Sequence, residues 1–438
     1  MEEAKASAES RDGTAEKARA KPAAKGAGGF VISSLIGSHT LTHIYSQGFQ
    51  VVIPRIYKDM GLVPIEAGLI DTVRWLSSGF FSLVVGFFVD MFQHRRGFFL
   101  GLSMAMIGLG YLLVSWAPTY FLILLAIAFA GIGGSIWHPP ALGLLAQRFP
   151  KHRGLMMALH RSTGNLGDTL GPILVGFLMV GAVSIVGFRL VGPDLTWRHV
   201  LQVGVPVSMG LATLIWVLLW KVGGPKVQAP PFRPNLVAQV GNLKKALASK
   251  GMVNLLAVAA LRGMGDRALV LFLPLYLAVD LGMDSLGVGF RVGLLTALGI
   301  FTGPLIGSLS DRIGRKPVIV GIMMVGGMMP LVIANSGTGM FLLVAIVVAG
   351  VFMYTVNSMV QASAMDLVEG QRLEGTFIGL LWGFNSLFSA ISPVVAGAIA
   401  GVWGFKAAFY YSSVLTLTGA LLATRLPRLA SGVARAHH

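Results

Sequence analysis

Long apolar runs recur along the whole chain and alternate with short polar segments. Each run is about 20 residues long, the length that a helix needs to cross the hydrocarbon core of a bilayer. Strands of a membrane barrel would instead alternate apolar and polar residues over about ten positions. The pattern therefore predicts an all-α polytopic membrane protein. Its twelve spans are expected near residues 30–53, 64–90, 97–115, 120–146, 153–180, 199–220, 252–279, 286–309, 317–335, 340–364, 373–400 and 406–424.

The longest polar break divides the spans into two sets of six. It covers residues 222–251 and is rich in proline and lysine, so we expect a cytoplasmic linker between bundles at 30–221 and 252–426. Residues 1–29 are rich in Ala, Lys, Glu and Gly and lack the apolar segment of a signal peptide. We expect them to form a disordered cytoplasmic tail, with a second cytoplasmic tail at 427–438.

Composition and charge agree with a membrane protein. Hydrophobic residues make up 55% of the chain and charged residues 12%, too little charge to cover a soluble domain of 438 residues. The net charge of +16 does not require a nucleic-acid partner, because Lys and Arg concentrate in the segments predicted to be cytoplasmic. This bias places both termini inside the cell and the protein in the inner membrane. The absence of cysteine excludes disulfides and thiolate metal sites.

A charged motif occurs twice, as "GFFVDMFQHRRGF" from Gly86 and "GSLSDRIGRKPV" from Gly307. Shifting the sequence by 221 positions, from 61 to 282, superposes many special residues. The matching pairs are Gly61/Gly282, Gly68/Gly289, Gly86/Gly307, Asp90/Asp311, Arg95/Lys316, Gly154/Gly375, Pro172/Pro393 and Gly176/Gly397. A constant offset across several predicted helices indicates a duplicated six-helix unit, an arrangement found in one large class of transporters.

The second copy resembles the cytoplasmic signature of the major facilitator superfamily, G-x-x-x-D-R-x-G-R-[KR]. The first copy departs from it at Met91 and Gln93. The resemblance implies a secondary transporter of two pseudo-symmetric six-helix bundles, in which the motif braces cytoplasmic helix ends. The motif residues are Gly86, Asp90, Arg95, Gly307, Asp311, Arg312, Gly314 and Arg315. The alternative is that these basic residues only fix the topology.

A narrower resemblance covers the fourth and fifth spans. "GIGGSIWHPPALGLLAQRF" and "RGLMMALHRSTGNLGDTLGP" are similar to the corresponding spans of fosmidomycin-resistance-like exporters. "GDTLGPILVG" also resembles the fifth-span signature of proton-coupled antiporters, with its last Gly displaced by one position. The Arg that begins the fourth-span signature of many drug antiporters is absent. This resemblance implies proton-coupled efflux.

Charged side chains inside the spans are the main functional candidates, because each costs about 2.5–3.5 kcal/mol at the bilayer centre unless it faces a cavity or a partner. They are Arg74, Arg161, Arg262, Arg267 and Arg291, with Asp71, Asp168 and Asp266. The excess of arginines favours an anionic or acid-bearing small molecule as substrate. Arg291 could instead reach the outer interface.

Helical spacing groups several of these residues. Asp71 and Arg74 are neighbours on one face, either as a self-neutralising pair or as an anion contact tuned by the carboxylate. Arg161, Asn165 and Asp168 share one stripe, on which Asp168 is either a proton carrier or the partner of an arginine. Asp71, Asp168 and Asp266 are the predicted proton-coupling residues.

His39 and His43 are four residues apart and share a face of the first span. Three interpretations remain open: cavity lining with proton exchange, structural hydrogen bonding, and metal binding. Metal binding is disfavoured because no carboxylate or third ligand is nearby in sequence. His138 precedes two prolines, and we interpret it as a histidine at the end of a helix.

We expect a set of substrate-binding side chains in a central cavity, formed by His39, His43, Arg74, Arg161, Asn165, Arg262, Asn357 and Asn385. No Walker motif or nucleophile–base set is present, so neither an ATP-driven pump nor an enzyme is expected, and no metal or cofactor. The predicted partners are a small molecule, protons and the lipid bilayer, with the protein as a monomer. Proton-coupled uptake of an anion and a non-transporting scaffold or sensor are the alternatives.

Overall fold

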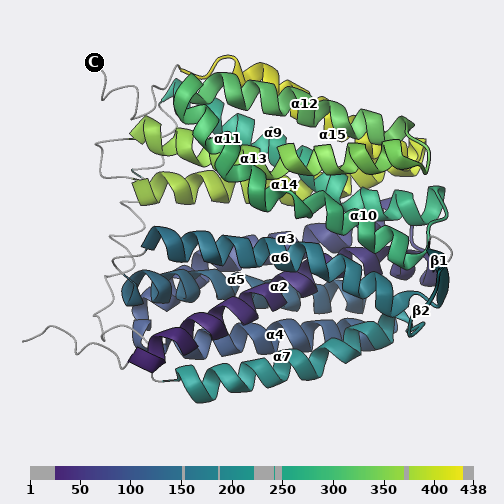
Figure 1. Cartoon of the computed structure of the whole chain (residues 1–438), viewed down its shortest axis with the longest axis horizontal. Helices are drawn as coiled ribbons and strands as arrows, with labels where there is room; N and C mark the ends of the chain where they lie inside the picture. The colour runs from purple at the N-terminus through teal and green to yellow at the C-terminus, as the bar shows by residue number, and fades with distance from the viewer. Residues whose placement is uncertain are drawn as a thin grey trace, which may run out of the picture.

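The computed structural model describes residues 25–149, 153–185, 188–220, 241, 249–368 and 374–427. Two helical bundles lie side by side (Figure 1). The first consists of α2 (Lys25–Asp59), α3 (Pro64–Met91), α4 (Arg96–Trp116), α5 (Tyr120–Arg148), α6 (Arg153–Met179) and α7 (Trp197–Leu219). The second consists of α9 (Lys250–Leu275), α10 (Ser285–Ala297), α11 (Gly299–Ile313), α12 (Arg315–Asn335), α13 (Met340–Val368), α14 (Glu374–Trp403) and α15 (Phe405–Ala423).

This architecture confirms the predicted fold of two six-span bundles. Among the described residues, seven helices are long and apolar enough to cross a membrane by length and composition alone. The helices α2, α3, α6, α9 and α15 fall outside that set. Four of these five carry candidate functional residues, namely His39, Arg74, Asp168 and Arg262.

Three local features differ from the sequence prediction. The eighth span is not continuous, because α10 and α11 are separated at Leu298. Gly299 follows the break, and a Cβ there would lie 2.9 Å from Cβ of Tyr354 on α13, so glycine permits a close approach at the cost of helix propensity.

A hairpin of β1 (Ala182–Ile185) and β2 (Phe188–Val191) lies between α6 and α7 in the chain, with Ala182 paired to Val191. The helix α2 begins at Lys25, inside the stretch predicted as a disordered tail. The rest of that tail, most of the linker and the second tail from 428 onward lie outside the described residues.

The bundles meet along two pairs of helices, α3 with α14 and α6 with α10. Residues that are 221 positions apart in the sequence make equivalent contacts in the two helix pairs. A Cβ on Gly68 would collide with the carbonyl oxygen of Pro393. A Cβ on the equivalent Gly289 would collide with the carbonyl oxygen of Pro172. Gly397 packs on the Pro64 carbonyl, and Gly176 on that of Ser285. Small residues at these positions let the backbones of the two halves touch.

Polar contacts join the two bundles at the end of the molecule where α2 ends and α10 begins, and we call this the closed end. Arg55 Nη2 donates to Ser285 Oγ at 2.9 Å, and Lys58 Nζ donates to the Ala278 carbonyl at 3.1 Å. The β1–β2 hairpin lies at this end too (Figure 1).

The repeated charged motif lies at the opposite end. Gly314 has φ +94° and ends α11, and Arg315 then binds Asp311 (2.6 Å) and Asp366 of α13 (3.2 Å). In the first copy, the Arg95 guanidinium lies 4.9 Å from the centre of the Trp220 ring. Gly86 and Asp90 lie in α3, with side-chain surroundings outside what the structure describes, and Arg312 is exposed. The second copy thus ties α11 to α13 within one bundle.

Candidate functional site

Asp71 and Arg74 form a buried pair on α3. The Arg74 Nη2 atom lies 2.7 Å from Asp71 Oδ1, while its Nη1 donates to the Ser46 carbonyl at 2.9 Å. Gln50 Nε2 also donates to Asp71 Oδ1, at 3.3 Å. Three residues along a helix bring the two side chains together, as predicted, and this contact belongs to both sequence alternatives, the self-neutralising pair and the anion contact tuned by Asp71.

Arg262 and Asp266 form the equivalent local pair on α9, at 2.7 Å. Arg262 Nη1 also donates to the Met353 carbonyl of α13 at 3.3 Å. Both side chains line a cavity between α9, α12, α13 and α15 of the second bundle, together with Phe352 and Ser412. The described residues that line this cavity include neither Arg74 nor Arg161, so it is not shared with the first bundle.

Of the five arginines predicted inside spans, Arg161, Arg267 and Arg291 have no carboxylate at ion-pair distance among the described residues. Arg291 is bonded within its own helix α10, which leaves Arg161 on the first bundle and Arg267 on the second. Arg161 on α6 is exposed. Arg267 on α9 reaches across to α3, where its guanidinium lies 3.6 Å from the centre of the Trp75 ring. Tyr354 of α13 interacts electrostatically with both guanidiniums. These side chains leave an excess of positive charge where the bundles face each other.

Asp168 pairs with a histidine rather than with an arginine. His43 Nδ1 lies 2.7 Å from Asp168 Oδ1, which joins α2 to α6, and Asp168 is buried. Of the two sequence alternatives for Asp168, a proton carrier or an arginine partner, the second differs from the structure, in which the partner is His43, while the proton-carrier role stays a prediction. Asn165, on the same stripe, is half-buried.

The remaining candidate residues of the second half have local surroundings that the structure describes one by one. Asn357 accepts a hydrogen bond from Gln361 at 3.3 Å within α13. Asn385 Oδ1 is buried without a hydrogen-bond partner in the described structure and lies beside Gly263 of α9. Arg291 donates to the Gly287 carbonyl at 3.1 Å within α10, toward the closed end.

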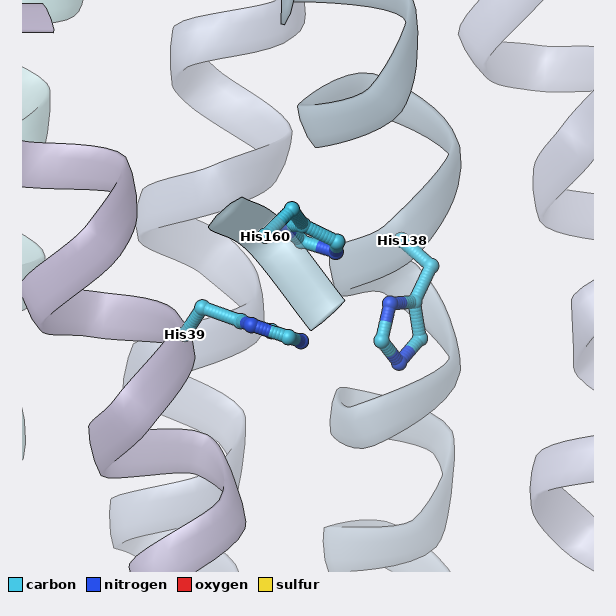
Figure 2. Close-up of side chains that lie close together, drawn as sticks. All are labelled: His39, His138 and His160. Carbon is cyan, nitrogen blue, oxygen red and sulfur yellow. The ribbon is translucent and has the colours of Figure 1, made fainter. Parts of the chain in front are cut away.

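The His39 and His43 rings are neighbours, with centroids 4.6 Å apart, but only His43 pairs with Asp168. The His39 ring stacks on that of His160, with centroids 3.7 Å apart, and His138 approaches both of these rings edge-on (Figure 2). The sequence analysis missed His160, Tyr354 and Trp75 because their partners come from other helices. For His160, its position next to Arg161 on the polar helix α6 was the available signal.

Comparison with known proteins agrees with this architecture. The family model described as Major Facilitator Superfamily matches residues 35–380 and 255–436. The chain is 25% identical over 414 residues to the uncharacterized MFS-type transporter YfnC of Bacillus subtilis, covering 88% of this chain and 91% of that protein. It is 22% identical over 375 residues to the fosmidomycin resistance protein of Escherichia coli, covering 83% and 86%.

A solved structure has the same fold. It is a bacterial homolog of the human lysosomal transporter Spinster in an inward-facing and occupied conformation, with a TM-score of 0.76 and 15% sequence identity. The match covers 91% of this chain and 97% of that one.

Proposed function

The chain belongs to the major facilitator superfamily, and we propose on this premise that it exports a small anionic or acid-bearing molecule in exchange for protons. Transport by this class of protein alternates the access of one central site between the two sides of the membrane. The resistance named in one relative and the fifth-span signature support the outward direction.

The unpaired Arg161 and Arg267 carry the proposal for an anion. Arg74 and Arg262 are neutralised by aspartates at 2.7 Å, so they add no net charge. Arg161 and Arg267 lie on opposite bundles, and an anion between them would be stabilised by both. Tyr354 can add a hydroxyl hydrogen bond to the same ligand.

We propose Asp168 as the main proton carrier. Protonation of its carboxylate would weaken the contact with His43 and thereby loosen α2 from α6. Asp71 and Asp266 support the proposal less, because each is held by an arginine of its own helix.

The charge distribution supports cytoplasmic termini in the inner membrane. With that orientation the closed end faces outward, and this conformation would be open to the cytoplasm. The motif residues Asp311 and Arg315 would then brace cytoplasmic helix ends as the conformation changes.

Purified protein should be stabilised against heat by an anionic ligand from a panel of carboxylates, phosphates, phosphonates and fosmidomycin. Ligand at 100 times its Kd adds about 2.7 kcal/mol to the free energy of unfolding. Arg161→Gln and Arg267→Gln should each lose a charge-assisted hydrogen bond of about 1.5–3 kcal/mol, a weakening of Kd of about 10- to 150-fold. Thermal-shift titration measures both quantities.

Arg189→Gln is the matched control, because Arg189 lies on the exposed β2 strand away from the bundle interface. It should bind the ligand like the parent protein. Equal Kd values for all four proteins would remove the support for an anion site. Import of the ligand into vesicles under an inward proton gradient would favour the uptake alternative, and binding without flux would favour a sensor.

A further inference from the structure

Three histidines from three helices converge in the first bundle. They are His39 of α2, His138 of α5 and His160 of α6 (Figure 2). One ring nitrogen from each lies within 4.8 Å of the others. A Cβ on Gly164 would lie 2.8 Å from His39 Cε1, so glycine at this position leaves the rings room.

Two of the imidazoles have a buried nitrogen without a hydrogen-bond partner in the described structure, His39 Nε2 and His160 Nε2. His39 is 2% exposed and His160 9% exposed. A buried polar atom left unpaired carries a free-energy penalty, and two in one cluster indicate a missing ligand.

One hydrogen-bond arrangement at Thr163 leaves His39 Nε2 free for a ligand. The Thr163 hydroxyl donates to the His160 carbonyl at 2.8 Å, so toward His39 Nδ1, at 3.1 Å, it can only accept. A hydroxyl has a single proton to give. Nδ1 of His39 therefore carries the hydrogen, and Nε2 of the neutral ring presents a lone pair to the cluster. Metal-bound histidines are oriented in this way by a partner on the other nitrogen.

Charges of both signs lie near the cluster. The His43 ring lies 4.6 Å from that of His39 and is paired with Asp168, so one carboxylate lies a single ring away from the site. Arg161 follows His160 on α6 and interacts electrostatically with His138 and His160, so the site itself holds no excess of negative charge. The cluster itself contains only neutral nitrogen donors, which suit transition metals better than the oxygen-seeking Mg²⁺ or Ca²⁺.

We propose that His39, His138 and His160 bind one divalent transition-metal ion of the Zn²⁺ class. Three protein imidazoles leave a fourth position for water or another ligand. An imidazole binds a metal in the plane of its ring, so the stacked rings of His39 and His160 must turn out of their parallel arrangement for all three nitrogens to reach Zn–N distances of about 2.0–2.1 Å. The ion would clamp α2, α5 and α6 together. The proposal stands whether or not the transported molecule is an anion.

Equilibrium dialysis with ZnCl₂ tests the site on tag-free, full-length protein in which His437 and His438 are changed to Gln in every sample. One Zn²⁺ per chain should bind and raise the unfolding temperature, whereas MgCl₂ should do neither. His138→Ala, whose side chain is exposed, and His39→Ala should lose the binding. Thr163→Val, which keeps all three ligands, should weaken the affinity by about 10- to 100-fold.

His199→Ala is the matched control, since His199 is exposed on α7 and lies outside the cluster. It should bind Zn²⁺ like the parent. Circular dichroism and gel filtration establish that each variant is folded. Binding by none of the proteins, or equal binding by His138→Ala and His199→Ala, would overturn the proposal, and neither result would affect the anion titrations.

Discussion

Gly397→Leu will force the closed end apart and stop transport. A Cβ at this position already lies 2.6 Å from the Pro64 carbonyl oxygen and 2.7 Å from Ile65 Cα, so a larger side chain has no room while α14 lies on α3. Overpacking of this kind costs about 1–3 kcal/mol, enough to shift an equilibrium between two conformations by about 5- to 150-fold.

The chain contains no cysteine, so one introduced thiol reports the opening. Ser285→Cys is suited to this because Ser285 is buried at the pseudo-symmetric contact with Gly176. Its labelling by a maleimide should accelerate in the Gly397→Leu background. Gly401→Leu is the matched control, since Gly401 lies one turn farther along α14 with open space around it. Equal labelling rates in the two backgrounds would show that the contact does not hold the closed end.

Asp168→Asn will abolish transport driven by a proton gradient while leaving exchange of substrate across the membrane intact. The amide has nearly the shape of the carboxylate and can still accept a hydrogen bond from His43, but it cannot take up a proton at working pH. Coupling requires a group that changes charge during the cycle. Reconstituted vesicles loaded with the best ligand of the anion panel separate the two activities: gradient-driven flux should fall to background, and counterflow should persist.

Asp194→Asn is the control for this substitution. Asp194 has φ +53°, a conformation that asparagine tolerates as well as aspartate, and it lies between the hairpin and α7. Both activities should match the parent protein. Gradient-driven flux that survives Asp168→Asn would assign the proton to another group, with Asp71 and Asp266 next in order.

The sequence alone was sufficient to predict the membrane spans, the internal duplication and the ion pair within one helix. A bilayer fixes the length of each apolar run, and an offset of three or four fixes which side chains meet on one helix, as for Asp71 with Arg74. Contacts between helices were not predictable in this way. The pairs His43–Asp168, His39–His160 and Arg267–Trp75 depend on how neighbouring helices are rotated, which no single segment specifies.

The break at Leu298 escaped prediction for a related reason. Apart from Arg291, the eighth span is apolar or uncharged, and its mean hydropathy gives no sign that it divides at Leu298. The break accompanies the close approach of Tyr354 on α13 to Gly299, a tertiary contact. The β1–β2 hairpin was missed because each strand has only four residues.

Leu298 also makes the two halves mechanically unequal. By the offset of 221, α3 of the first bundle corresponds to α10 and α11 of the second, but α3 is one unbroken rod from Pro64 to Met91. Its counterpart has a joint halfway along. The portion before the joint is anchored on α6, and the portion after it leads to Asp311. The backbone at Leu298 stays close to helical, with φ −82° and ψ −15°, so the interruption marks the place where the second half would bend most readily rather than a separate hinge.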